Sequence, residues 1–153
     1  MNSYSKLVGV CLLGILLLQA CSTDPRRDLA KFKVDGVRRE EAGYRAAAME
    51  FVKAAQAGNV EDMIRVTSAL TLTNSGAGVV RTVYAEQVVP QLKGADVRWD
   101  SRGDVLLDDT YNVGFQFYGK VTRDDKSFPI YIIIMKESGR FAVINFRKTR
   151  KQK

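Results

Sequence analysis

The chain has 153 residues, of which 24 are basic and 17 acidic, with no histidine and two cysteines. This length is typical of one domain, and an apolar share of 46% indicates a packed globule. The lack of histidine excludes serine–histidine and cysteine–histidine catalysis and imidazole metal sites. Two cysteines are too few for a cysteine-rich zinc site or a disulfide framework. We therefore expect neither a metal nor a cofactor.

Residues 1–20 have the pattern of a secretory leader. Residues 1–6 are polar with one positive charge, and residues 7–18 form an unbroken apolar run of twelve. Such a run matches the apolar core of a signal peptide and is shorter than the ~20 residues of a membrane-spanning helix. Two alternatives are an ordinary cleaved leader with a free thiol at Cys21 and an uncleaved anchor helix. The loop-like segment that follows Cys21 argues against the anchor helix.

The end of this apolar run, Leu18-Gln19-Ala20-Cys21, resembles the lipobox of bacterial lipoproteins. The resemblance implies that the leader is cut before Cys21, which then carries a diacylglyceryl thioether and an acylated amine, with palmitate as a typical chain. Two or more acyl chains hold a protein stably on a bilayer. Because Ser22 and not aspartate follows the cysteine, the resemblance also implies the outer membrane, facing the periplasm. An inner-membrane location stays open.

The mature chain is expected to begin with a lipidated flexible tether at residues 21–39. This segment is rich in basic residues, has few apolar ones and is too short to fold as a domain. We expect the folded domain at residues 40–148 and a basic tail at residues 149–153.

Three helices are predicted at the start of the domain. Residues 40–57 are rich in alanine and carry an apolar stripe at helical spacing, and Gly58 predicts the end of this helix. A second, short helix follows from about residue 60. Residues 71–78 are turn-forming and break the pattern, which resumes over residues 79–89 until Pro90 kinks or ends it.

Four strands are predicted after the helices, at residues 97–99, 113–121, 128–135 and 141–146. Residues 128–135 are apolar on both faces, which indicates a central strand. Helices followed by an antiparallel meander give an α+β fold, with the N-terminal helices packed on a curved sheet of about four strands.

The order of elements over residues 40–148 resembles the nuclear-transport-factor-two-like fold, the cystatin-like cone. The resemblance is carried by the helix–turn–helix segment FVKAAQAGNVEDM (residues 51–63), by the strands that follow the helices, and by the terminal hairpin KESGRFAV (residues 136–143). In this hairpin Phe141 stands where the family often has tryptophan. The resemblance implies a bent sheet that wraps the helices and leaves a cone between them. Members use the cone for catalysis, for ligand binding, or only pack against partner proteins, so the fold does not give the function.

Five aromatic side chains could line a cavity in the cone or simply fill the core. These candidates are Trp99, Phe115, Phe117, Tyr131 and Phe141. An enzyme of this fold would need a carboxylate base near a tyrosine. The chain offers Tyr44, Tyr84, Tyr118 or Tyr131 with Asp96 or Asp100, but no spacing ties these groups together. We therefore predict no catalytic residues.

The C-terminal segment carries five cations in seven residues, Arg147, Lys148, Arg150, Lys151 and Lys153. They could contact anionic lipid headgroups, peptidoglycan carboxylates or an acidic partner, and a solvated chain end is the alternative. Nucleic acid is not expected as a partner, because the leader directs the chain out of the cytoplasm and no groove-reading motif is present.

The sequence thus predicts a lipid-anchored, periplasm-facing binding or assembly module without catalytic activity, for example in an envelope or secretion complex. Its expected partners are the membrane, through acylated Cys21, and periplasmic or envelope proteins. The alternatives are a pocket protein for a small molecule or lipid and a small enzyme that uses the cone. The oligomeric state is not predicted.

Overall fold

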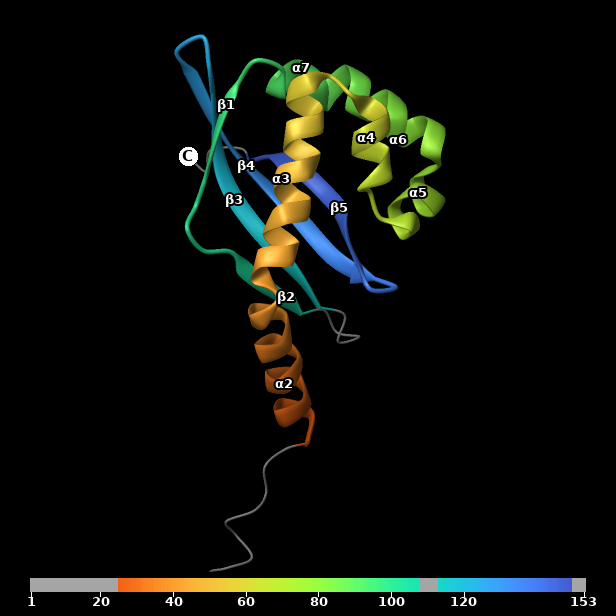
Figure 1. Cartoon of the computed structure of the whole chain (residues 1–153), viewed down its shortest axis with the longest axis vertical. Helices are drawn as coiled ribbons and strands as arrows, with labels where there is room; N and C mark the ends of the chain where they lie inside the picture. Colours follow the sequence, from red (N-terminus) through yellow and green to blue (C-terminus); the bar gives the residue numbers. More distant parts are fainter. Residues whose placement is uncertain (1–24, 108–112, 150–153) are drawn as a thin grey trace, which may run out of the picture. The chain divides into compact units, whose positions relative to one another are not determined.

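The computed structural model describes residues 25–107 and 113–149 (Figure 1). The chain divides into two compact units, Met1–Phe32 and Lys33–Lys153, and the structure describes the first unit only at residues 25–32. The predicted leader and Cys21 lie outside the described residues. No helix in the described part of the chain is long and apolar enough to span a membrane.

The expectation of a flexible tether is wrong for residues 25–39, which form helix α2 (Pro25–Arg39). Proline is tolerated at the first position of a helix, where its missing N–H has no partner to lose. Most of the other residues in the segment are leucine, alanine, lysine and arginine, which are good helix formers. The many charges suggested a solvated tether, but charge alone does not prevent a helix.

Helix α3 (Glu41–Ala57) confirms the prediction for residues 40–57. Its buried face follows the predicted apolar stripe, and Gly58 ends it in the left-handed conformation with φ of 74°. Glycine adopts this conformation without a steric penalty, so the chain can turn directly into the next helix. Figure 1 shows α3 lying across one face of the sheet, with the shorter helices beside it.

Three short helices follow α3, and most of the break predicted at residues 71–78 is wrong. Helix α4 (Val60–Arg65) begins after Asn59, whose side chain accepts a hydrogen bond from the Asp62 N–H at 3.1 Å. Residues 71–75, expected as turn, belong to helix α5 (Ala69–Ser75). The Ser68 hydroxyl caps α5 by accepting from the Thr71 N–H at 3.2 Å, and only Gly76, with φ of 80°, separates it from helix α6 (Ala77–Val83).

Pro90 does not end the helical segment. After α6 the chain widens into the π-helix η2 (Tyr84–Val88) and continues as the short helix α7 (Val89–Leu92). Proline has no N–H for the preceding turn, and in η2 the Val89 N–H instead bonds back to the Tyr84 carbonyl, five residues earlier. The wider turn lets the helical path pass the proline as far as Leu92.

The sheet has five strands, β1 (Asp96–Trp99), β2 (Asp104–Leu107), β3 (Val113–Arg123), β4 (Lys126–Glu137) and β5 (Arg140–Lys148). All pairings between them are antiparallel, in the order β1-β3-β4-β5, and β2 also pairs with β3. The prediction of a central strand at residues 128–135 is confirmed, because β4 lies between β3 and β5. Strand β2 lies in a part of the chain for which the sequence predicted no strand.

The two faces of the sheet differ in burial. On the face toward the helices, Ile130, Ile132 and Ile134 are fully buried. On the opposite face of β4, Tyr131 and Ile133 are only half-buried. The core therefore lies between α3 and one face of the sheet, and the other face of β4 presents apolar side chains that are partly in contact with solvent.

Aromatic rings fill the space between α3 and the sheet. Tyr44, Phe51, Phe115 and Phe117 are each at most 1% exposed. The rings of Phe115 and Phe117 stack with centroids 4.8 Å apart, and Tyr44 lies 5.7 Å from Phe115. Phe51 meets Tyr84 edge-on at 5.2 Å. These contacts occupy the centre of the expected cone with packed side chains.

Candidate functional site

The five aromatic residues predicted for a pocket do not come together. Phe115 and Phe117 are core residues, and Phe141 packs on Tyr44 with centroids 4.7 Å apart. Tyr131 lies on the far face of the sheet, opposite Tyr118. Trp99 does line a cavity. Of the two possibilities that the sequence left open for these rings, filling the core holds for Phe115 and Phe117 on the inner face of β3.

The predicted basic tail is described only at its start. Arg147 and Lys148 belong to β5 and are exposed, and the Lys148 ammonium lies 4.2 Å from the centre of the Phe128 ring. The Thr149 N–H bonds to the Pro129 carbonyl at 2.9 Å, so the strand pairing extends to this point. Arg150, Lys151 and Lys153 lie outside the described residues.

The candidate tyrosines do not meet a carboxylate inside the core. The Tyr84 hydroxyl pairs with the Thr67 hydroxyl at 2.9 Å, and burial raises the pKa of Tyr84. The Tyr118 hydroxyl bonds to the Asp104 carboxylate, and burial together with this bond raises the pKa of Tyr118. Asp104 is exposed, so this pair lies on the open face of the sheet. Among residues 25–107 and 113–149, no cluster of three or more acidic, histidine or cysteine side chains could hold a metal ion.

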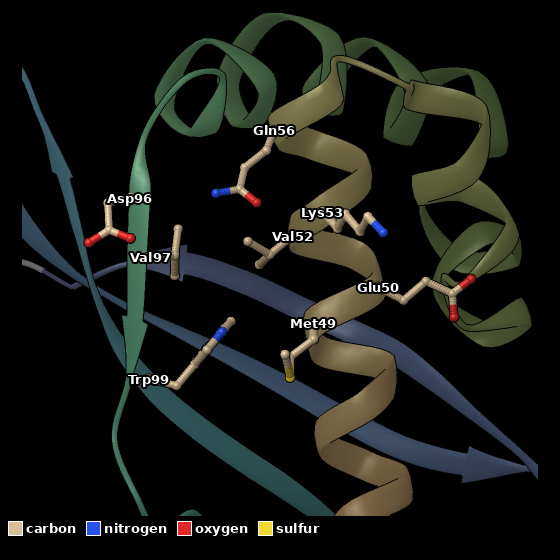
Figure 2. A pocket seen from close by; sticks show the side chains of 8 residues that line it. All are labelled: Met49, Glu50, Val52, Lys53, Gln56, Asp96, Val97 and Trp99. Atoms are coloured by element: carbon tan, nitrogen blue, oxygen red, sulfur yellow. The ribbon is translucent and has the colours of Figure 1, made fainter.

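A cleft lies between α3 and β1. It has a volume of about 500 Å³. Figure 2 shows the side chains of the α3–β1 cleft, which are Met49, Glu50, Val52, Lys53, Gln56, Asp96, Val97 and Trp99. A volume of this size lies in the usual range for ligand-binding clefts.

Two sets of hydrogen bonds hold α3 and β1 together at the ends of this cleft. Near the C-terminal end of α3, the Gln56 amide donates to the Ala95 carbonyl at 2.7 Å. Near the N-terminal end of α3, the Arg45 guanidinium donates to the carbonyls of Asp100 at 3.1 Å and Ser101 at 3.0 Å. Between these ties the helix and the strand separate, and the cleft opens there.

Arg45 is itself fixed from two further directions. It forms an ion pair with Glu41 at 2.9 Å, one turn earlier on α3, and its guanidinium lies 4.6 Å from the centre of the Phe117 ring. The residues it bonds, Asp100 and Ser101, lie in the interruption between β1 and β2. Arg45 therefore holds the edge of the sheet where it breaks, and makes one end of the cleft rigid.

Apolar side chains form the wall between these ties. In Figure 2, Met49 and Val52 project from α3 toward Val97 and Trp99 of β1, whereas Lys53 and Glu50 project away from the strand. Met49 is 52% exposed, so its side chain is accessible from solvent. The cleft thus offers an accessible apolar surface of aliphatic, thioether and indole groups.

Charges surround this surface unevenly. The acidic side chains near the cleft already have partners: Glu50 pairs with Arg65 at 3.1 Å, and Asp96 with Arg98 at 3.2 Å. By contrast, Lys53 makes no hydrogen bond or ion pair with any residue that the structure describes. The mouth of the cleft therefore carries an uncompensated positive charge.

Sequence reasoning identified Trp99 as a pocket candidate but missed Met49, Lys53 and Gln56. These three residues lie beside the buried stripe of α3, where an amphipathic pattern predicts ordinary solvent contact. The pattern shows which residues leave the core but not which of them face a neighbouring strand. A methionine next to the stripe was the one available signal.

A second, smaller opening lies between the helices and β5. It has a volume of about 260 Å³ and is lined by aliphatic, aromatic and polar side chains. Its lining residues are Thr71, Ser75, Val79, Val80, Val83, Tyr84, Val88, Ile144, Asn145 and Phe146. Because Thr67 already bonds the Tyr84 hydroxyl, the main chemical property of this pocket is apolar contact.

Comparison with known proteins identifies the fold and not the site. No protein-family model and no curated protein matches the chain. Among solved structures, the chain is similar to a protein of unknown function with a cystatin-like fold from Nostoc punctiforme, with a TM-score of 0.51 and 12% sequence identity. The match covers 71% of this chain and 88% of that chain. At this identity the likeness shows the fold alone, and the expected cystatin-like α+β fold is confirmed.

Proposed function

We propose that this chain is a lipid-anchored, non-catalytic binding module that faces the periplasm from the outer membrane and assembles with envelope proteins. The lipobox-like sequence ending at Cys21 supports the anchor and the compartment. The α3–β1 cleft is the observation that carries the binding role. It is an apolar opening held between two fixed ends, on a domain whose interior is occupied by packed rings.

The packing supports binding over catalysis. Pocket enzymes place a base and a hydroxyl in a water-poor cavity, where burial tunes the pKa of each group. Here the buried hydroxyl of Tyr84 faces Thr67, and the carboxylate that meets Tyr118 is exposed on the outer sheet face. The apolar α3–β1 cleft suits recognition of a partner surface better than proton transfer.

The anchor is tested by labelling cells with a palmitate analogue. The wild-type chain should be labelled and should sediment with the outer membrane. The Cys21→Ser variant should be unlabelled and should leave the membrane fraction. A wild-type chain that is unlabelled and water-soluble would contradict the anchor.

The binding role is tested by photo-crosslinking in cells. A photoreactive amino acid at position 49, in the cleft, should give discrete protein adducts of defined mass. The same group at position 126, an exposed site at the start of β4, serves as the matched control and should not give those adducts. Identical adducts at both positions, or none at position 49, would remove the support for the cleft.

The smaller pocket beside β5 favours a second candidate function, the binding of a small apolar molecule. Most of its lining residues are aliphatic or aromatic, and Val79 at its rim is 61% exposed. An environment-sensitive fluorescent fatty acid should bind the wild-type chain and bind more weakly after Val83→Asp. Equal binding by both proteins would exclude this pocket.

A further inference from the structure

We propose that the partner enters the α3–β1 cleft as an extended, acidic peptide segment, which adds to the free edge of β1 as a further strand. This inference rests on the proposed function, since it names the partner class of the same cleft. It depends on three features of β1: its unpaired backbone edge, the side chains on its helix-facing side, and the charge on its other side.

The backbone of β1 has one paired and one open edge. In the order β1-β3-β4-β5, β1 is the terminal strand, and no other strand of the described chain pairs with it on the far side. The Asp100 N–H donates to the Tyr118 carbonyl at 2.9 Å, which shows that the peptide groups of Asp100 face β3. By alternation, the peptide groups of Arg98 and Asp96 also face β3, and those of Val97 and Trp99 face outward.

An added strand would satisfy these outward N–H and C=O groups. Peptides bind exposed sheet edges in this way in several recognition domains, with main-chain bonds giving affinity and side-chain pockets giving specificity. Edge strands left open are usually short or guarded, because they recruit other strands. Strand β1 is short, with four residues, but its edge lies beside an accessible apolar cleft.

Alternate side chains of the incoming strand would meet different surroundings. Residues opposite Val97 and Trp99 would lie on the helix-facing side, against the apolar wall that includes Met49 (Figure 2). Residues between them would lie on the outer face, next to Arg98. The site therefore favours apolar residues at every second position.

The charge on the outer face favours acidic residues at the other positions. Arg98 stands directly opposite Lys120 in the pairing of β1 with β3, and like charges at this spacing repel. Asp96 relieves this repulsion in part, through its contact with Arg98 at 3.2 Å. An incoming glutamate beside Arg98 would add a second counter-charge.

The direct test uses the full chain in detergent and a synthetic eight-residue peptide of alternating valine and glutamate. The matched control is a peptide of the same composition with four valines followed by four glutamates. The alternating peptide should bind at least about tenfold more tightly, because only it presents an apolar and an acidic face as a strand. Equal affinity for the two peptides, or binding by neither, would overturn the proposal.

Backbone methylation separates strand addition from side-chain docking. One version of the alternating peptide is N-methylated on its valines and another on its glutamates, and only one set of N–H groups can face β1. In antiparallel addition the valine N–H groups bond to β1, so their methylation should weaken binding about tenfold and methylation of the glutamates should not. Loss of binding in both versions, or in neither, would overturn strand addition.

Two measurements on the protein complete the test. Hydrogen exchange of the Val97 and Trp99 amides should slow when the peptide binds, while the Asp96 and Arg98 amides, which already face β3, should change little. Arg98→Gln should weaken the alternating peptide about two- to fivefold, and the control Lys126→Gln should have no effect. Unchanged exchange at Val97 and Trp99 would contradict the inference, even if crosslinking from position 49 still supports the cleft as a contact site.

Discussion

Replacing Glu137 by glutamine should destabilise the domain in a pH-dependent way. Glu137 lies at the end of β4, and its carboxylate accepts a hydrogen bond from the Ser68 hydroxyl at 2.5 Å and one from the Ala69 N–H at 2.9 Å. It thereby joins the terminal hairpin to the start of α5, next to the fully buried Ser68. The variant keeps one acceptor oxygen but loses the charge and the second acceptor.

The size of the effect follows from these two bonds. Hydrogen bonds to a charged group contribute about 1.5–3 kcal/mol each, and one of them is retained in weakened form by the glutamine oxygen. Since Glu137 is only partly shielded from solvent, we expect a loss of about 1–2 kcal/mol at pH 7. For a domain of this size that corresponds to a fall in Tm of roughly 4–8 °C.

The pH dependence has a definite sign. Burial raises the pKa of Glu137, but the bonds from Ser68, Ala69 and Leu70 and the charge of Arg140 outweigh burial and lower the pKa overall. A carboxylate with a lowered native pKa contributes stability above its unfolded pKa of about 4.3, and this contribution is lost as the pH falls through the native pKa. The difference between wild type and Glu137→Gln should therefore be full at pH 7 and vanish in strong acid.

Urea unfolding at a series of pH values measures this difference. Glu86→Gln is the matched control, because Glu86 is exposed and has no ion pair or hydrogen bond with a described residue. The control should change the free energy of unfolding by less than about 0.5 kcal/mol. A Glu137→Gln effect that equals the control at pH 7, or that persists unchanged at low pH, would refute the reasoning.

Three further changes should have separable effects. Phe51→Ala should lower the free energy of unfolding by about 3–5 kcal/mol in urea titrations, because it empties the centre of the aromatic core, and a loss below 1 kcal/mol would contradict that role. Gly103→Ala should lower the free energy of unfolding by about 1–3 kcal/mol in the same assay, because an added Cβ would lie 2.4 Å from the Phe115 ring. Gly78→Ala has open space around the added Cβ, so it should leave the free energy of unfolding unchanged or raise it by up to about 1 kcal/mol. Equal effects of the two glycine substitutions would argue against the close packing at position 103. Cys21→Ser should leave the free energy of unfolding of the detergent-solubilised chain within about 0.5 kcal/mol of the wild-type value, because Cys21 precedes the folded domain. A larger change would show that this residue contributes to folding.

The elements that the sequence predicted best are those in which the apolar residues of the sequence are also the residues buried in the core. Helix α3 carries periodic apolar residues that face the core, and β4 contains a continuous apolar run, so residue pattern placed both of them. Helix α5 has no buried residue in its span and depends on Ser68 and Glu137 at its start. Without a buried residue α5 has no apolar period, and the distant Glu137 that accepts from its first N–H leaves no local signal, which explains why the sequence predicted a turn at residues 71–75.

The candidate site was less predictable than the fold. Trp99 stood out by residue type, but the cleft lies between the hydrogen bonds that Gln56 and Arg45 of α3 make to the residues on either side of β1. Such a cleft depends on the angle between a helix and a strand, which no residue pattern encodes. The open edge of β1 likewise depends on which strand ends the sheet, a property of topology.

The π-helix η2 has a consequence for the alignment of the last helical segment. Four buried residues, Val80, Tyr84, Val88 and Leu92, recur at intervals of four along α6, η2 and α7. In a uniform α-helix, residues four apart drift about 40° around the axis at each step, so such a row would spiral away from the core within three steps. The wider turn of η2 rotates the chain back, which keeps Leu92 on the same side as Val80. Deleting a single residue within Tyr84–Val88 would restore ordinary helical winding and leave Leu92 only about 20° around the axis from Val80, so the π-helix accommodates one extra residue without moving Leu92 out of the core.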